Sequence, residues 1–248
     1  MNTTGKTVLV TGGGSGIGFQ IAKAFSDKGN KVLIVGRSKE RLHEAASKLK
    51  NVDYFPADIS KEKDIDSLVA HVTKNYPALD VLVNNAANTT VYTVGVGAGA
   101  LDKAKEEIAT NYFAAVNLIE KLLPVLEKQP EAAIVNVTAI LALAPAIPMP
   151  THSASKAALH SYTQVLRLTL EKQNSSVKVF ELMPPLTNTE FSKAIGGANG
   201  IAAEVVAQEL LHGLENNIPE IRVGRVEGFY QLFFAGSEKA VVALNQPQ

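Results

Sequence analysis

His152 and Lys156 lie four residues apart in the segment "MPTHSASKAALHSY" (149–162), whose spacing of small and apolar residues is typical of a helix. Side chains four residues apart share one face of a helix, and His160 continues that face by one more turn. An imidazole can act as a general acid or base near neutral pH, and a neighbouring ammonium lowers its pKa by disfavouring the charged form. The pair is therefore a candidate for proton transfer, and the alternative is a histidine that only fills space in an inactive pocket. We expect no metal there, because the sequence links no carboxylate or third histidine to this face.

A glycine-rich segment, "TGGGSGIG" (11–18), lies between an apolar run and a helical pattern. Three residues separate Gly12 from Gly16, and one residue separates Gly16 from Gly18. Glycines there let the backbone approach a pyrophosphate, and the start of a helix supplies free N–H donors and a positive dipole. A plain tight turn is the alternative interpretation. We favour a dinucleotide-binding loop over a turn, because a predicted strand precedes the segment, a predicted helix follows it, and further strand–helix units come after.

The second apolar run ends in "GRSKE", where Arg37, Ser38 and Lys39 precede the first acidic residue, Glu40. An acidic residue at the end of the second strand would bind a ribose 2′-hydroxyl and repel a 2′-phosphate, whereas a guanidinium suits a phosphate. The segment therefore favours NADP over NAD. The alternative is a solvated basic start of a helix.

Short apolar runs alternate with longer amphipathic segments, and these elements must position the candidate residues. Near-continuous apolar runs are typical of parallel strands covered on both faces. Strands are predicted at 6–11, 31–36, 52–56, 79–85, 132–138, 177–183 and 218–224. Helices are predicted at 16–28, 39–50 (capped by Ser38), 61–75 (capped by Ser60), 103–128, 153–173 and 201–216.

This regular alternation predicts an α/β fold, a doubly wound (Rossmann) parallel sheet of about seven strands with helices on both faces. We expect a single dinucleotide-binding domain over 1–248, in which 225–248 is a C-terminal extension. The stretches 86–100 and 187–200, rich in small residues, are predicted to be loops.

The composition excludes several classes of protein. Lysine plus arginine balance aspartate plus glutamate at 24 each, so no basic field exists to hold nucleic acid or a membrane surface. The absence of cysteine excludes disulfides and a thiol nucleophile, and suits a cytoplasmic protein. Residues 132–150 carry no charge, but three prolines would break a helix there, so we expect a buried strand that runs into an apolar loop.

Six motifs, in this order and at these separations, resemble the short-chain dehydrogenase/reductase family over nearly the whole chain. They are "TGGGSGIG" (11–18), "NNAA" (84–87), Asn111 in "TNYFAAVNL", "IVNVTA" (134–139), "HSASK" (152–156) and "MPPLTNT" (183–189). Within the family they look most like a group of oxidoreductases encoded in Gram-positive D-alanylation operons. The family usually has glycine at position 185, where this chain has Pro185.

The resemblance implies contacts with each part of the cofactor. Phosphates would be lined by Gly12, Ser15, Gly16, Ile17 and Gly18; adenine by Asp58 and Ile59; ribose by Asn84 and Ala86; the nicotinamide ribose by Lys156; and the carboxamide side by Pro184, Thr187 and Thr189.

The resemblance also implies hydride transfer between nicotinamide and a carbonyl or carbinol carbon, with four catalytic positions. Asn111 and Lys156 match two of them. The other two depart from the family: Ala139 stands where a serine hydroxyl is expected, and His152 stands where the tyrosine acid is expected. Thr138 is adjacent to Ala139, but neighbouring strand residues point to opposite faces, so we expect no replacement from it.

These departures leave several functions open. Four interpretations fit the sequence. The first is an NADP(H)-dependent oxidoreductase with an altered or disabled proton donor, and the second is a catalytically inactive cofactor-binding protein. The others are a deliberately inactivated variant and a non-redox isomerase or cyclase. The expected pocket walls (86–101, 141–151 and 191–200) are mostly apolar and small, which fits a small-molecule substrate. The resemblance implies a homodimer or homotetramer formed by the two long helices at 103–128 and 153–173.

Overall fold

The strands form from the apolar, β-branched runs, and they lie parallel in one sheet. The computed structural model describes residues 1–246. The seven strands have the order β3-β2-β1-β4-β5-β6-β9, and each neighbouring pair is parallel. Their bounds are β1 Thr7–Thr11, β2 Lys31–Gly36, β3 Val52–Pro56, β4 Leu79–Asn84, β5 Ala132–Val137, β6 Val177–Met183 and β9 Glu220–Arg222. The predicted seven-stranded Rossmann-type sheet is thereby confirmed.

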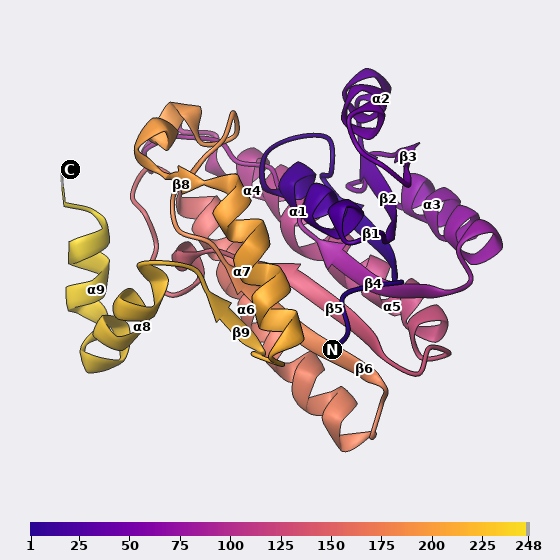
Figure 1. The fold of residues 1–248 in the computed structure, drawn as a ribbon. Helices are drawn as coiled ribbons and strands as arrows, with labels where there is room; N and C mark the ends of the chain where they lie inside the picture. Colours follow the sequence, from indigo (N-terminus) through magenta and orange to yellow (C-terminus); the bar gives the residue numbers. More distant parts are fainter. Residues whose placement is uncertain (247–248) are drawn as a thin grey trace.

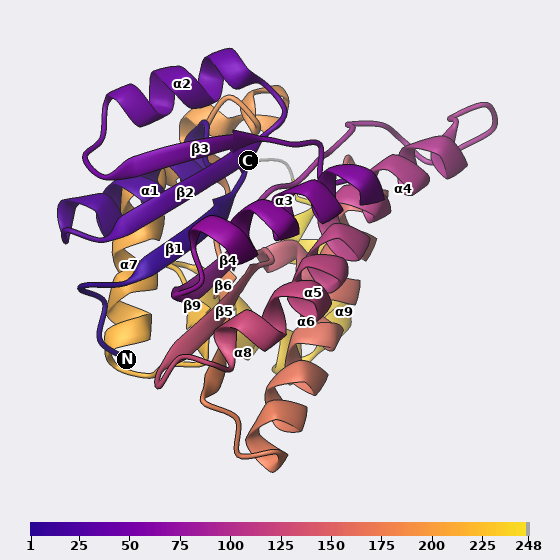
Figure 2. The same cartoon turned by 90° about the vertical axis from the view of Figure 1, so that its right-hand side faces the viewer.

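Helices cover both faces of this sheet (Figures 1 and 2). One face packs against α1 (Gly16–Asp27), α2 (Lys39–Ser47) and α7 (Ala203–Glu215), and the other against α3 (Glu62–Asn75), α5 (Ala114–Leu126) and α6 (Pro150–Lys172). Alternate residues of β1 pack into the two hydrophobic cores on opposite faces of the sheet. Val8 and Val10 lie in the core on the α1 side, whereas Leu9 lies in the core on the side of α3 and α5. Burial on both faces explains why the strands carry continuous apolar runs.

The helix predicted at 103–128 is three segments joined end to end. It consists of α4 (Ala100–Ile108), a π-helix (Ala109–Phe113) and α5. Figure 2 shows α4 and the loop before it extending beyond the layer of helices. Residues 86–99 form neither helix nor strand, as predicted.

The predicted cap of α3 is wrong. The helix begins at Glu62, and its N-cap is Lys61, whose side chain makes no capping hydrogen bond. The Ser60 hydroxyl donates instead to Asp58, at 2.7 Å. Ser38 does cap α2, because its hydroxyl accepts from the Arg41 backbone N–H at 3.2 Å.

The chain after β6 builds a small region over the carboxyl edge of the sheet. It contains the two-stranded pair β7 (Thr187–Asn188) and β8 (Ile201–Ala202), with 3-10 turns at Lys193–Ile195 and Gly197–Asn199. The C-terminal extension forms α8 (Val226–Ala235) and α9 (Ser237–Leu244), which lie side by side (Figure 1). Residues 247–248 of the expected extension lie outside the described residues.

The uncharged stretch 132–150 forms β5, a 3-10 turn (Ile140–Ala142), an apolar loop and the first residue of α6, as expected for a buried strand that runs into a loop. Within residues 1–246, none of the helices combines the length and the apolar character needed to cross a bilayer.

Candidate active site

The strand order reverses between β1 and β4, and the predicted cofactor residues gather at this point. In open parallel sheets, ligands bind outside the carboxyl ends of strands where the order reverses. The glycine loop follows β1, and Asn84 and Ala86 lie at the end of β4, the next strand of the sheet. The sheet topology therefore brings the first and second of the six motifs, "TGGGSGIG" and "NNAA", together.

Two glycines are required by close packing in the loop after β1. Gly12 has a φ of +68°, and a Cβ there would lie 2.9 Å from the Cα of Ala86. A Cβ on Gly18 would lie 2.3 Å from the carbonyl oxygen of Gly12. These contacts hold the loop against the end of β4 and allow α1 to begin directly beneath it.

The glycine loop and the first turn of α1 contain backbone N–H groups without a hydrogen-bond partner among residues 1–246. The first backbone bond at the start of α1 runs from Phe19 N–H to the Ser15 carbonyl, at 3.1 Å, and the N–H groups of residues 14–18 donate to no residue within 1–246. Ser15 is the N-cap of α1, is exposed, and makes no capping hydrogen bond through its side chain. Free N–H groups at a helix start fit a pyrophosphate. Thr189 lies opposite, with its Cγ2 3.3 Å from the position of a Cβ on Gly16.

The ends of β2 and β3 place a cation beside an acid. Arg37 is exposed, and Asp58 is half-buried. Burial opposes ionisation of Asp58, but hydrogen bonds from Ser60 and the charges of Lys61 and Arg37 outweigh it and lower the Asp58 pKa. Ile59 is buried beside it. The Ser38 hydroxyl is already engaged, since it caps α2 and donates to Glu40 at 2.9 Å, so Arg37 is the freer of the two predicted phosphate ligands.

Asn84 is held within the sheet, and two residues that sequence reasoning missed organise the chain after it. The Asn84 amide donates to Asn136 at 2.9 Å, while its Oδ1 is buried and has no partner among residues 1–246. Thr11 Oγ1 accepts from the backbone N–H groups of Asn85 and Ala86, and the Asn85 amide donates to the Thr11 carbonyl. The doubled asparagine in "NNAA" was the signal for Asn85.

Asn111 lies in the π-helix between α4 and α5, where it is buried. Its amide donates to the Asn88 carbonyl and to Ser155 Oγ, each at 2.9 Å, and its Oδ1 accepts from Asn88 N–H at 2.7 Å. A π-helical turn is rare and is frequent at functional sites. Asn111 therefore joins the loop after β4 to α6, and Ser155 is a further residue that the sequence did not single out.

Glu107, one turn before Asn111, is a fully buried carboxylate that was also missed. It accepts from the Thr90 backbone N–H at 2.6 Å and from the Thr151 hydroxyl at 2.5 Å. It ties the same loop to the first turn of α6, next to His152.

His152 is buried at the start of α6, with its Nδ1 3.1 Å from the Asn88 carbonyl oxygen. Burial, and next the charge of Lys156, lower the pKa of His152 to about 4, against an opposing contribution from the contact with the Asn88 carbonyl. The predicted effect of Lys156 on the imidazole is thus present, but it is secondary to burial. The ring lies 5.8 Å from the Phe191 ring, between centroids.

Lys156 is buried one turn farther along α6, and its Nζ donates to the Val137 carbonyl at 2.7 Å. Burial lowers its pKa to about 8, against an opposing contribution from the charge of Glu181. The ammonium makes no other hydrogen bond among residues 1–246, so two of its three donors are free for hydroxyl groups of a ligand.

Ala139 follows β5 and offers only a methyl group where a hydroxyl was expected. Thr138 does not replace it, because its Oγ1 donates to the buried Glu181 carboxylate at 2.6 Å. The predicted orientation of Thr138 away from the site agrees with this contact. His160 also turns to Glu181, with Nδ1 2.9 Å from both carboxylate oxygens, rather than toward His152.

The segment after β6 packs close to the same site. The Pro184 carbonyl accepts from Ile140 N–H at 3.1 Å, next to Ala139. The Thr187 hydroxyl donates to the Pro185 carbonyl at 2.9 Å, and that of Thr189 lies 3.1 Å from Ser192 Oγ. The backbone around Pro184 is therefore tied to the end of β5.

The three expected walls expose apolar side chains. Val94 (68 % exposed) and Val96 lie in the loop after β4, Ile147 (63 %) lies before α6, and Phe191 (47 %) follows β7. Large exposed apolar side chains gathered on several segments mark a surface that can bind an apolar ligand.

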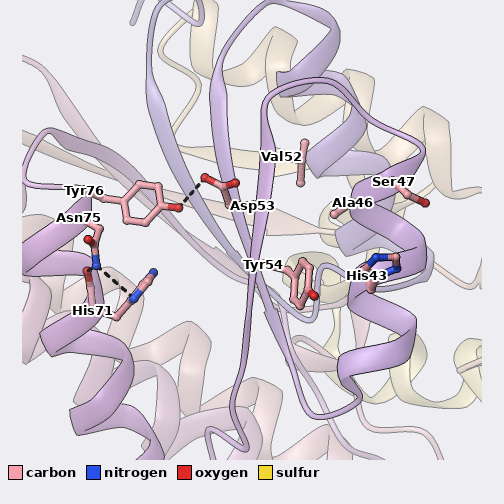
Figure 3. A pocket seen from close by; sticks show the side chains of 9 residues that line it. All are labelled: His43, Ala46, Ser47, Val52, Asp53, Tyr54, His71, Asn75 and Tyr76. Atoms are coloured by element: carbon pink, nitrogen blue, oxygen red, sulfur yellow. Dashed lines mark hydrogen bonds between the residues drawn. The ribbon is translucent and has the colours of Figure 1, made fainter.

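A separate, open hollow of about 570 Å³ lies at the β3 edge, between α2 and α3 (Figure 3). Its polar groups contact one another: the Tyr76 hydroxyl donates to Asp53 at 2.7 Å, and Asn75 donates to the His71 carbonyl. None of its lining residues belongs to the site around His152.

Comparisons with known proteins agree with this architecture. A family model described as short chain dehydrogenase matches residues 6–200. The chain is 40 % identical to the uncharacterized oxidoreductase DltE of Bacillus subtilis, over 99 % of this chain and 98 % of that protein, in agreement with the closer resemblance inferred from the motifs. It is similar to a short chain dehydrogenase from Burkholderia cenocepacia solved in complex with NADP (TM-score 0.87, 26 % identity, both chains covered entirely).

Two further relatives are informative. The chain is 32 % identical to a fatty acyl-CoA reductase of Acinetobacter baylyi, over 76 % of this chain and 64 % of that protein. An L-sorbose reductase from Gluconobacter frateurii, solved with NADPH and L-sorbose, has a TM-score of 0.76 and 26 % identity, covering 85 % of this chain and 89 % of that one. From the match over residues 6–200 and the similarity along the whole chain, this protein belongs to the short-chain dehydrogenase/reductase family of oxidoreductases.

Proposed function

We propose that this protein is an NADP(H)-dependent oxidoreductase that interconverts an alcohol and a carbonyl compound, with the imidazole of His152 as the proton-transfer group. The observation that carries the proposal is the contact between His152 Nδ1 and the Asn88 carbonyl. A carbonyl oxygen only accepts hydrogen bonds, so this contact requires the proton on Nδ1. The Asn111 amide nitrogen also lies 3.5 Å from Nδ1, but it already donates to the Asn88 carbonyl and to Ser155, each at 2.9 Å, so it does not compete for Nδ1 as an acceptor.

This contact selects the tautomer of the neutral ring. With the proton on Nδ1, the lone pair is on Nε2, and Nε2 has no hydrogen-bond partner among residues 1–246. It is also not among the buried polar atoms without a partner, so solvent or a substrate can reach it. A free, oriented lone pair is suited to removing the proton of an alcohol.

The protonation state sets the favoured direction. Burial lowers the His152 pKa to about 4, so at pH 7 only about one ring in a thousand is an imidazolium. Oxidation of an alcohol uses the abundant neutral ring, whereas reduction of a carbonyl needs the rare imidazolium to donate from Nε2. At neutral pH the proposed site therefore works best as a base.

The nicotinamide, when bound, supplies or accepts the hydride. The residues of this chain bind and orient it: the free N–H groups of 14–18 suit the phosphates, and the two free donors of Lys156 suit ribose hydroxyls. Exposed Arg37 at the end of β2 supports NADP rather than NAD, as in the NADP and NADPH complexes of two similar proteins.

The exposed apolar side chains around the site support a substrate with an apolar body. Val94 and Val96 lie in the loop after β4 and Ile147 precedes α6, while the Phe191 ring lies 5.8 Å from the His152 ring, between centroids. The fatty acyl-CoA reductase among the relatives acts on a compound of this kind by its name. We propose an alcohol or aldehyde with a medium-length apolar chain.

A second candidate function is cofactor binding without turnover, and Ala139 favours it. The methyl group offers no donor to a substrate oxygen, and Thr138 is held by Glu181. Loss of one such donor costs about 10²–10³ in rate in comparable sites.

One experiment separates the two candidates. NADPH binding is measured by fluorescence, and alcohol oxidation and carbonyl reduction are then measured for this chain, for His152→Ala, and for Ala139→Ser combined with His152→Tyr. Activity in this chain that is lost in His152→Ala supports the proposal. Binding with turnover only in the double variant supports the second candidate, and absence of NADPH binding in all three contradicts both.

We also propose a cytosolic homo-oligomer formed through α5 and α6. Phe113 (61 % exposed), in the π-helix that leads into α5, and Val165 (60 %) and Leu168 (58 %) of α6 present apolar surface beside the edge-on contact of Tyr112 and Tyr162. An exposed apolar face of this kind fits a self-complementary interface.

A further inference from the structure

Asn75, Asn216 and Asn245 each lie at the end of a helix and cap its last turn with their own side chain. They end α3, α7 and α9, and each amide donates to the carbonyl four residues earlier, at 2.9, 2.9 and 2.8 Å. Such a bond satisfies one of the carbonyl groups left free at a helix end. Among residues 1–246, the side chains of Asn75 and Asn216 bond only within their own helices. Asn245 also reaches a distant part of the chain, so capping alone does not account for it.

The Asn245 side chain binds two backbone groups that lie 98 and 100 residues earlier in the chain. Its Oδ1 accepts from the Ile147 N–H at 2.6 Å, and its Nδ2 donates to the Pro145 carbonyl at 3.0 Å. The second hydrogen of Nδ2 caps α9 at Val241, so both donors of the amide are used. Turning the amide over would place its oxygen against two carbonyls, so its orientation is fixed. We call the bonds to Pro145 and Ile147 the Asn245 clamp; it anchors the loop 143–149, which leads into α6.

The same loop is also bonded to segments of the candidate site. The Pro148 carbonyl accepts from the N–H of Tyr92, in the loop after β4, at 3.1 Å. The Ala146 N–H donates to Ser153 Oγ at 3.2 Å, and Ser153 directly follows His152 on α6. This loop is therefore a bridge between the C-terminal extension and the segments next to His152.

The clamp fixes the backbone at Ile147 but leaves the side chain of that residue 63 % exposed. Apolar contacts strengthen the attachment: Met149 belongs to a buried apolar cluster, and Phe229 of α8 and Leu244 of α9 pack against it. Ala139, at one of the four positions expected to be catalytic, packs against the same cluster. An exposed apolar side chain on a fixed backbone is suited to contact an apolar ligand, because binding then requires no ordering of the loop.

We propose that Asn245 is a positioning residue that fixes the loop 143–149 and so places the Ile147 side chain against the apolar chain of the substrate. The inference deepens the proposed function and rests on it for the substrate class, an alcohol or aldehyde with an apolar chain. Asn245 bonds to the loop and to its own helix, whereas His152 is oriented by the Asn88 carbonyl. Without the clamp, substrate binding must also order the loop. That loss of conformational entropy raises KM, while the proton-transfer step is unchanged.

The first test compares KM with kcat for the oxidation of n-butanol, n-hexanol and n-octanol with NADP⁺. Asn245→Ala should raise KM several-fold, most for n-octanol, whose longer chain has more surface to place against Ile147, and leave kcat and NADPH affinity nearly unchanged. Asn245→Asp keeps the shape of the side chain but sets a carboxylate oxygen against the Pro145 carbonyl, so it should raise KM as well. A role in packing alone would survive that change. Asn216→Ala removes the matching cap from α7 and should alter neither constant.

Amide hydrogen exchange, measured without cofactor or substrate, tests the clamp separately from activity. The Ile147 amide should exchange several-fold faster in Asn245→Ala than in the unmodified chain, because its acceptor is gone, and at an unchanged rate in Asn216→Ala. Unchanged exchange in Asn245→Ala, or an unchanged KM for n-octanol, overturns the inference. A parallel loss of NADPH affinity in that variant also overturns it, because the effect would then be general rather than local. If the unmodified chain oxidises none of the alcohols, the proposed function fails instead, and exchange alone decides whether the clamp holds the loop.

Discussion

The Nδ1 atom of His152 lies 3.1 Å from the carbonyl oxygen of Asn88, and the side chain of Asn111 holds that same residue through both its N–H and its carbonyl. The imidazole is therefore oriented by backbone that Asn111 positions. Loop, π-helix and α6 form one unit around the ring.

The two reaction directions should respond oppositely to pH. Alcohol oxidation needs neutral His152, so its kcat/KM should rise through pH 4 and remain level up to the loss of the Lys156 proton near pH 8. Carbonyl reduction needs the imidazolium, so its kcat/KM should fall about tenfold per pH unit above pH 4. Initial rates from about pH 3 to pH 9 measure both profiles. A reduction rate that is constant from pH 5 to 8 would rule out His152 as the donor, and the Ala139→Ser/His152→Tyr variant is the control.

Gly18→Ala should weaken NADPH binding by at least about tenfold. The added Cβ would lie 2.3 Å from the Gly12 carbonyl oxygen, so the glycine loop must shift away from the cofactor phosphates. Gly228→Ala is the matched control, because nothing lies within 4 Å of its Cβ position and it lies within α8. Unchanged affinity in a folded Gly18→Ala variant would contradict the assignment of this loop.

Arg37→Leu should reduce affinity for NADPH by about tenfold and leave affinity for NADH nearly unchanged, because only NADPH carries the 2′-phosphate that a guanidinium binds. Fluorescence titration with both nucleotides measures the ratio. Lys39→Leu controls for the general loss of one positive charge nearby. Equal losses of affinity for the two nucleotides would show that Arg37 does not bind the 2′-phosphate.

Asn111→Leu should lower the free energy of unfolding by about 2–3 kcal/mol, since it leaves the Asn88 N–H without its partner, leaves the Asn88 carbonyl with His152 alone, and removes the bond to Ser155. Ser155→Ala removes only one of these bonds and should cost less. Urea unfolding measures both. A difference of less than about 0.5 kcal/mol between Asn111→Leu and the unmodified chain would exclude a role in holding the loop.

Phe113→Glu should convert the oligomer to a monomer, because it places a charge in the proposed apolar interface of α5 and α6. Light scattering coupled to size exclusion gives the mass. Val205→Glu, at an exposed valine of α7 on the opposite face of the sheet, should leave the mass unchanged. A monomeric mass for the unmodified chain would contradict the proposal at once.

The sheet and its helices were largely predictable, because continuous apolar runs such as Val8–Val10 are buried on both faces. The position of His152 and Lys156 on one face of α6 also followed from the sequence, because residues four apart in a helix lie on the same face. The Ser60 cap was wrong because α3 begins one residue later than predicted, at Glu62, so that Lys61 and not Ser60 occupies the N-cap position.

The groups that decide the chemistry depend on distant parts of the chain. The Asn88 carbonyl that orients His152 is a backbone atom 64 residues away, and no side-chain pattern marks it. Glu181 reaches Thr138 only because β5 and β6 are neighbours in the sheet. Sequence periodicity carries no information on such contacts, which arise from strand order and loop path.

The π-helix at Ala109–Phe113 makes the spacing between Glu107 and Asn111 depend on a single residue. Such a turn holds one residue more than an α-helix needs, and each residue of a regular helix turns by about 100°. Deletion of Thr110 would rotate Glu107 away from Thr90 and Thr151 while Asn111 stayed in place. Chain length at this point is therefore as strict a requirement as side-chain identity, and shortening the segment by one residue would separate the loop after β4 from the first turn of α6.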